Sequence, residues 1–139
     1  MLTRLLLCLT LCSALLSAQP VNFLRDIRPL LSNKCFACHG PDEESREADL
    51  RLDTAGGATA DLEGRRAITP GKPDRSELVR RIMSEDPEKV MPPPDSGHEL
   101  SDTEKQMLQE WIRAGAEYEI HWSFIPPRKA SLPNVKQQD

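Results

Sequence analysis

The sequence predicts a small helical domain, and three observations lead to this prediction. Apolar residues recur at helical spacing, with Ile27, Leu30 and Leu31 on one face of a segment over residues 26–35. Two other segments begin with the pattern of a helix-capping box. No stretch shows the alternation of apolar and polar residues that a half-buried strand requires. We therefore expect about three to four short helices joined by Pro- and Gly-rich loops.

The first expected helix covers residues 26–35. Asp26 is its expected cap, and Pro29 falls in the first turn, where the missing N–H leaves no hydrogen bond unmade. The mixed charge run at 42–47 is expected to form a solvated loop or a short helix. Residues 53–73 contain several glycines and prolines, which are too many for a long helix or strand, so we expect a wrapping loop there.

Two capping boxes predict the remaining helices. The first box starts at Asp74 and predicts a helix of about ten residues. The second starts at Ser101 and precedes an apolar face that contains Trp111, with Gly115 suited to the C-terminal stop. We expect Trp111 to anchor this last helix in the core against the first helix.

Length and charge exclude several classes of protein. The chain has 139 residues, which corresponds to one small domain at most, and a net charge of −4. No cluster of Lys and Arg indicates binding to nucleic acid or to an anionic membrane surface. No apolar run is long enough for an ordinary membrane-spanning helix.

Residues 1–18 are typical of a secretory signal peptide. Arg4 supplies a basic start, residues 5–16 form an apolar run, and small residues precede the expected cleavage after Ala18. We therefore expect an exported, periplasmic or otherwise extracytoplasmic protein. The alternative is an uncleaved N-terminal anchor, because Leu16 lies where a small residue is preferred.

Cleavage would leave two cysteines, Cys35 and Cys38, in the sequence C-x-x-C-H that ends at His39. In an oxidising compartment such a pair forms a disulfide, binds a metal or is consumed covalently. The adjacent histidine favours covalent attachment of a c-type haem, with each thiol bonded to a vinyl group and His39 as the proximal iron ligand. A zinc site would lack a second close pair of ligands, and a thioredoxin-like redox pair would lack its βαβ context.

The candidates for the second axial ligand are methionines and histidines: Met83, Met91, Met107, His98 and His121. Met83 and Met107 lie on apolar helix faces and are most simply core residues. Met91 precedes three prolines, which would hold an extended segment across the open haem face. We assign Met91 as the distal ligand; His98 or an open site is the alternative.

Six sequence segments together resemble the planctomycete-type cytochrome c domain over most of residues 21–120: DIRPLL (26–31), CFACHGP (35–41), LRLD (50–53), PGKP (70–73), MPP (91–93) and WIRAGA (111–116). The resemblance implies an all-α, class I cytochrome c-like domain folded around one covalent haem c. It implies thioether bonds at Cys35 and Cys38, His39 as proximal ligand and Met91 as distal ligand.

The expected organisation is a signal peptide at 1–18, a haem domain at 19–122 and a Pro-rich tail at 123–139. Residues 121–127 resemble the connector that leads from such cytochromes into larger domains. The tail is therefore expected to be a linker to a further domain that this chain, as a fragment, would lack.

The expected function is outer-sphere electron transfer, because two strong axial ligands leave no iron position for substrate. The expected partners are a redox protein and the cytochrome c maturation machinery, without nucleic acid and without a membrane span in the mature chain. Two other functions stay open: a haem enzyme or gas-binding module with a displaceable distal ligand, and a haem-bearing adaptor module of a larger protein.

Overall fold

The computed structural model describes residues 19–120 and Ser123. The expected signal peptide (1–18), the candidate ligand His121 and the tail beyond Ser123 lie outside the described residues. Within the described part of the chain, no helix is long and apolar enough to cross a membrane.

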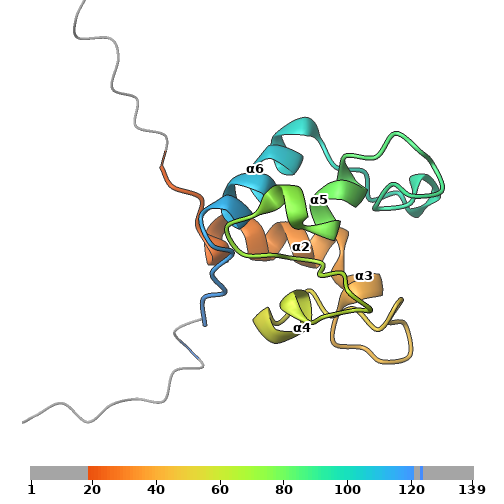
Figure 1. The fold of residues 1–139 in the computed structure, drawn as a ribbon, viewed down its shortest axis with the longest axis horizontal. Coiled ribbons are helices and arrows are strands. Elements are labelled where there is room, and N and C mark those ends of the chain that lie inside the picture. Colours follow the sequence, from red (N-terminus) through yellow and green to blue (C-terminus); the bar gives the residue numbers. More distant parts are fainter. Residues whose placement is uncertain (1–18, 121–122, 124–139) are drawn as a thin grey trace, which may run out of the picture.

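The described residues form helices and loops and contain no strand, which confirms the all-α prediction (Figure 1). There are five α-helices where three to four were expected, and two of them, α3 and α4, are only one turn long. The helical elements in chain order are η1 (Phe23–Ile27), α2 (Arg28–Lys34), α3 (Phe36–His39), α4 (Ala55–Thr59), η2 (Pro73–Arg75), α5 (Glu77–Ile82), η3 (Pro94–Ser96) and α6 (Asp102–Arg113). The only β-type pairing among these residues is one isolated bridge between Leu62 and Arg65.

The first helical run begins earlier than the sequence predicted. Asn22 is the N-cap, since its side-chain oxygen accepts a hydrogen bond of 2.8 Å from Arg25 N. Asp26 lies inside the π-helical turn η1, where it pairs with Arg25 and accepts from Asn22 N, so the prediction that Asp26 caps this helix is wrong. Asn22 can cap because its backbone is extended, whereas that of Asp26 is already helical.

The segment 53–73 is mostly the expected loop, but it contains α4. Thr54 caps this five-residue helix by accepting a hydrogen bond from Gly57 N. The charged run 42–47 forms no helix, and it is exposed except at Arg46.

The helix after Asp74 is shorter than predicted, and its predicted capping box does not form. Ser76 is the N-cap residue of the six-residue α5, but its side chain makes no capping bond. The Glu77 carboxylate, which the box would direct back to the backbone, pairs instead with Arg80 and Arg81 on the next turn. Because α5 begins at Glu77, this residue lies at the first helical position and not at the third, where a capping box requires it.

Helix α6 follows the prediction closely. Ser101 accepts from Glu104 N while the Glu104 side chain accepts from Ser101 N at 2.7 Å, which completes the capping box. The helix ends at Arg113, and Gly115 has a positive φ of 116° just beyond it. A glycine adopts this backbone conformation without a steric penalty, so it ends the helix as expected.

An aromatic cluster joins the two ends of the described fold. Phe23 and Trp111 stack with ring centroids 5.7 Å apart, and Tyr118 lies 4.7 Å from Phe23 and 5.2 Å from Trp111. The predicted role of Trp111 as a core anchor against the first helix is confirmed. The buried core around the cluster includes Ile27 and Leu31 from the first helical run and Leu108 and Ile112 from α6.

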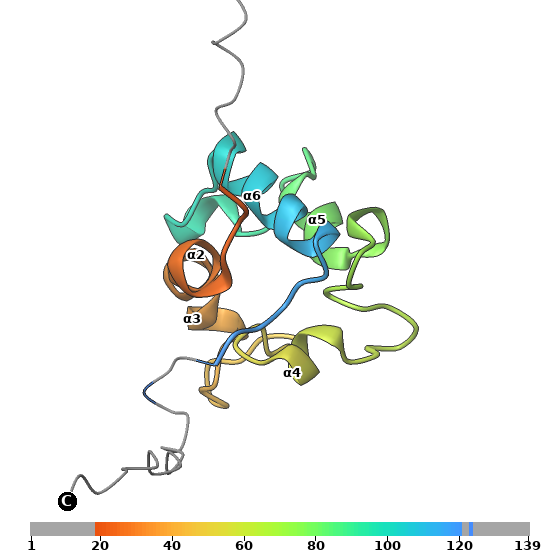
Figure 2. The same ribbon diagram turned by 90° about the vertical axis from the view of Figure 1, so that its left-hand side faces the viewer.

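The five α-helices are arranged as a ring, with α2 and α3 on one side and α5 and α6 across from them (Figure 2). The segment after α6 runs across this ring toward α3 and α4. It is fastened there by the Tyr118 hydroxyl, which donates a 3.0 Å hydrogen bond to the carbonyl of Leu52. The last segment of the fold thereby reaches the neighbourhood of the C-x-x-C-H motif.

Replacing Ser101 by alanine should lower the free energy of unfolding by about 1 kcal/mol, because Glu104 N loses the hydroxyl oxygen that accepts its hydrogen bond at the start of α6. Urea unfolding measures this change. Thr103→Ala, at an exposed position in the same turn, is the control and should leave the stability within about 0.5 kcal/mol. Equal effects of the two substitutions would contradict the assigned cap.

Candidate functional site

The C-x-x-C-H motif lies at the junction of α2 and α3. Cys35 is the C-cap of α2, and its N–H donates to Leu31 O at 2.8 Å. The N–H groups of Cys38 and His39 then donate back to Cys35 O, which winds the motif into one turn. Both cysteines carry free thiols; Cys35 is half-buried against the core and Cys38 is exposed. Two thiols and an imidazole are thus presented from a single turn.

The returning loop fastens the backbone of this turn. Glu47 N donates to Cys38 O, and Leu52 N donates to His39 O, each at 2.8 Å. The largely buried Arg46 side chain donates from Nε to Gly40 O at 3.1 Å and from Nη2 to the next carbonyl. The carbonyl groups at the end of α3 have no partners within the helix, and the loop therefore supplies their hydrogen-bond donors.

Gly40 is required by close packing rather than by backbone conformation. A Cβ atom at this position would lie 2.2 Å from the carbonyl oxygen of Phe36, a distance that no real contact tolerates. The chain therefore turns out of α3 directly against the backbone of the motif. Only a residue without a side chain allows this turn.

One hydrogen bond orients the ring of His39. Its Nδ1 lies 3.3 Å from Glu47 O, and in the tautomer protonated at Nδ1 this N–H donates to the carbonyl. Nε2 then keeps a free lone pair, which is the arrangement of a metal-binding histidine held by a backbone carbonyl. Burial lowers the pKa of His39, and Glu47 opposes this shift. The neutral imidazole is the form that can bind a metal.

Cys35 and Tyr118 share a partly buried environment. Burial raises the pKa of the Cys35 thiol to about 12, although Lys34 opposes the shift. Burial also raises the pKa of Tyr118, with the charges of Asp53 and Cys35 adding to the effect. Both groups are therefore neutral at physiological pH.

Met91 lies in a different wall, at a cavity of about 220 Å³ between α5 and the segment that leads to α6. Its N–H donates to Arg81 O at 3.2 Å, which ties it to the end of α5. The residues that line this cavity are mostly apolar: Ile82, Val90, Met91, Pro92, Pro94, Glu99, Leu100 and Lys105. The described hydrogen bonds do not join Met91 to the C-x-x-C-H turn, so the structure leaves its role as the distal ligand a prediction.

The proline run after Met91 is only partly extended. Pro93 has extended dihedral angles, but Pro94 begins the 3-10 helix η3, which corrects the expectation of an extended segment through all three prolines. Proline fits the first position of such a turn because its fixed φ is helical and its missing N–H needs no partner. His98, the alternative ligand, follows η3 and is half-buried.

The other methionines differ from each other. Met107 is half-buried against the core, in line with the prediction. Met83 is 52% exposed and accepts a weak hydrogen bond from Gln109, so its predicted role as core filler is wrong. The reason is that α5 ends at Ile82, and Met83 no longer continues the buried face.

Sequence reasoning missed the residues that hold the motif in place. Arg46 was expected to be a solvated member of a charge run, and neither Leu52 nor Tyr118 was expected to act at the site. A lone arginine in that run, close after Gly40, was the only local signal. Arg51, close to the end of the returning loop, forms a two-bond pair with Asp53.

Replacing Gly40 by alanine should lower the free energy of unfolding by about 2–3 kcal/mol, because the new Cβ forces the Phe36 carbonyl away. Urea unfolding and the yield of haem-loaded protein measure the effect. Gly56→Ala in α4 is the matched control, since a Cβ there meets no atom within 4 Å and should stabilise the helix by about 0.5–1 kcal/mol. A Gly40 variant as stable as wild type would contradict the close packing.

Comparison with known protein families gives a match over part of the chain. Residues 35–95 match the family described as planctomycete cytochrome C, which confirms the resemblance inferred from the sequence. The matched segment begins at Cys35 and also includes Cys38, His39 and Met91. No curated protein gives a significant match to the chain, and no solved structure does.

Proposed function

From the match of residues 35–95 to the planctomycete cytochrome c family, we propose that this chain is an exported mono-haem c-type cytochrome that carries single electrons. One observation carries the proposal: two free thiols and an oriented imidazole are presented from one turn whose carbonyls are bonded to a returning loop. This donor set fits a haem that is attached through two thioethers and ligated by the adjacent histidine.

Each residue of the proposed haem site has a separate role. Cys35 and Cys38 would form the two covalent bonds to haem c, and His39 would bind the iron through Nε2. Met91 would supply the thioether sulfur on the other side. The hydrogen bond from Nδ1 to Glu47 O keeps the His39 ring in one orientation, and such a bond strengthens the imidazole as a ligand.

The protein would set the redox properties through its ligands and its walls. A bound haem supplies a reversible one-electron couple at its iron. Met91 as a ligand would raise the potential, and the apolar side chains beside it, Ile82, Val90 and Leu100, would exclude water from that face. Both axial positions would be filled by the chain itself, so we propose a carrier of electrons and not an enzyme.

We also propose that the protein functions outside the cytoplasm. The composition of residues 1–18 supports export, and c-type cytochrome domains are typically extracytoplasmic. The proposed partners are the maturation machinery that attaches the haem and a redox protein that exchanges electrons with it.

Mature protein produced with a cytochrome c maturation system should carry haem that stays attached on denaturation. Its absorption spectra in both oxidation states should be low-spin, with the weak far-red band of a sulfur-to-iron bond in the ferric form. Covalent haem without this band would still support a c-type cytochrome but would refute Met91 as the iron ligand. Absence of attached haem, while a control cytochrome matures normally, would refute the proposed function.

Met91→Ala should convert the haem from low-spin to high-spin and lower its reduction potential, because the iron loses its sulfur ligand. Spectroscopy and redox titration measure both changes. Met83→Ala is the matched control, since it removes a half-exposed methionine from the adjoining turn and should change neither property. If Met91→Ala leaves the spectrum unchanged and His98→Ala alters it, the ligand is His98.

A further inference from the structure

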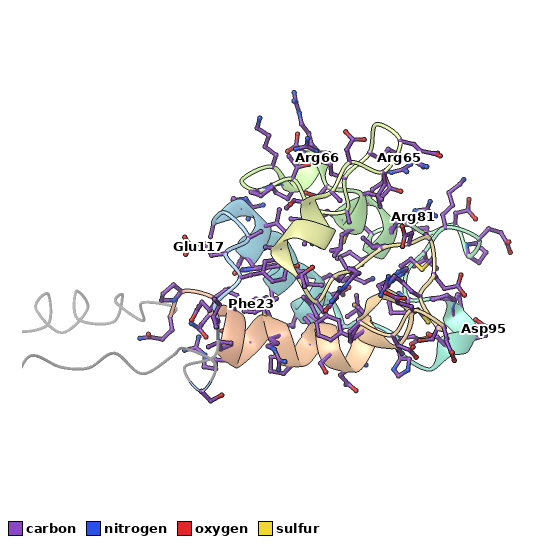
Figure 3. The ribbon with its side chains drawn as sticks, turned by 90° about the horizontal axis from the view of Figure 1, so that it is seen from below. Phe23, Arg65, Arg66, Arg81, Asp95 and Glu117 are labelled. Carbon is purple, nitrogen blue, oxygen red and sulfur yellow. The ribbon has the colours of Figure 1, made fainter. Side chains whose placement is uncertain are left out.

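A second cavity, of about 340 Å³, lies where the 61–69 loop meets η2 and the start of α5. Arg65 and Arg66, two of its lining residues, lie along the edge of the molecule opposite α2 (Figure 3). None of the proposed haem ligands lines it. The lining residues are predominantly polar: Asp61, Gly64, Arg65, Arg66, Thr69, Arg75 and Glu77.

A tight turn presents two of the arginines. Leu62 and Arg65 exchange both backbone hydrogen bonds, at 2.7 and 3.2 Å, around Glu63 and Gly64, which have φ values of 55° and 82°. Two consecutive positive φ angles are typical of the tight turns that close hairpins. The turn is anchored at its base, where Arg66 O accepts a 3.0 Å hydrogen bond from Glu77 N. Arg65 and Arg66 therefore extend from a defined backbone.

A buried serine holds the opposite wall. Ser76 is 2% exposed, and its hydroxyl oxygen accepts from Thr69 N and donates to Lys72 O, each at 2.9 Å. The Thr69 hydroxyl in turn donates to Arg75 O at 3.2 Å. The backbone around Arg75 is thus fixed relative to the loop that carries the other two arginines.

The charges of the cavity do not balance. The Glu77 carboxylate is shared by Arg80 and Arg81 outside the lining, and the Asp61 carboxylate accepts from Gly64 N. Arg65, Arg66 and Arg75 make no side-chain hydrogen bond or ion pair with any described residue. Three unpaired guanidinium groups thus line one small cavity in a chain whose net charge is −4.

We propose that this cavity binds a phosphate group, either as free inorganic phosphate or as the headgroup of a lipid. Guanidinium groups present paired N–H donors that match the spacing of phosphate oxygens, and convergent arginines are the usual protein ligands of such groups. The proposal does not depend on the haem site. It assigns a role to three arginines that the electron-carrier function leaves unused.

Isothermal titration of the full chain with inorganic phosphate, at low ionic strength and with chloride as the reference anion, tests the proposal. We expect saturable binding that is about tenfold weaker or worse in an Arg66→Gln, Arg75→Gln variant. The matched control is Arg28→Gln, Arg113→Gln, which removes the same charge from exposed positions elsewhere and should bind as wild type does. Binding of the same three proteins to phosphatidylglycerol vesicles distinguishes the headgroup from the free ion.

Saturable phosphate binding that is lost in the first variant alone supports the free ion, and vesicle binding with the same pattern supports the lipid headgroup. Binding to neither, or equal weakening in both variants, would overturn the proposal. Circular dichroism checks that the variants fold, as expected for arginines without described partners. The single Arg75→Gln change provides the same test if the double variant does not fold.

Discussion

The packing of Phe23, Trp111 and Tyr118 is the interaction on which the rest of the described structure depends. It joins the first helical turn to α6 and to the segment that follows α6. Tyr118 then donates from its hydroxyl to Leu52 O, and Leu52 N donates to His39 O. These contacts thus connect the aromatic cluster, through Tyr118 and Leu52, to the backbone of the candidate ligand His39. Aromatic side chains suit this duty because each combines a large apolar surface with, in tyrosine, one polar end.

The candidate site is held mainly by backbone groups, which explains how such short helices support it. Helix α3 has only four residues, too few to be stable alone. Its last carbonyls accept hydrogen bonds from Glu47 N, Leu52 N and the Arg46 side chain. The loop thus supplies the donors that the next turn of a longer helix would supply. The Glu47 carbonyl of this loop accepts the hydrogen bond that orients the His39 ring. Local order at the site is therefore a property of the returning loop.

The charge distribution separates two regions of the molecule. Around Cys35 and Tyr118 burial keeps the titratable groups neutral, which suits an apolar prosthetic group. Along the edge opposite α2, Arg65 and Arg66 are exposed on a fixed turn in an acidic chain. A local excess of one charge within an overall opposite charge attracts small counter-ions to one place. The two regions are therefore suited to different chemical groups.

The sequence alone determined what is encoded within a few neighbouring residues. The Ser101 capping box and the end of α6 at Gly115 depend on contacts across one or two turns, and the structure shows both where the sequence predicted them. Only the tertiary structure decided the other contacts. These are the hydrogen bonds from Arg46 to Gly40 O and from Leu52 N to His39 O, and the position of Arg75 in the same cavity as Arg65 and Arg66. These depend on segments that are distant or loosely patterned in the chain. The Asp26 and Asp74 caps were predicted wrongly because each helical run begins at another residue: Asn22 caps the first run, and Asp74 lies in η2, before α5 begins at Glu77.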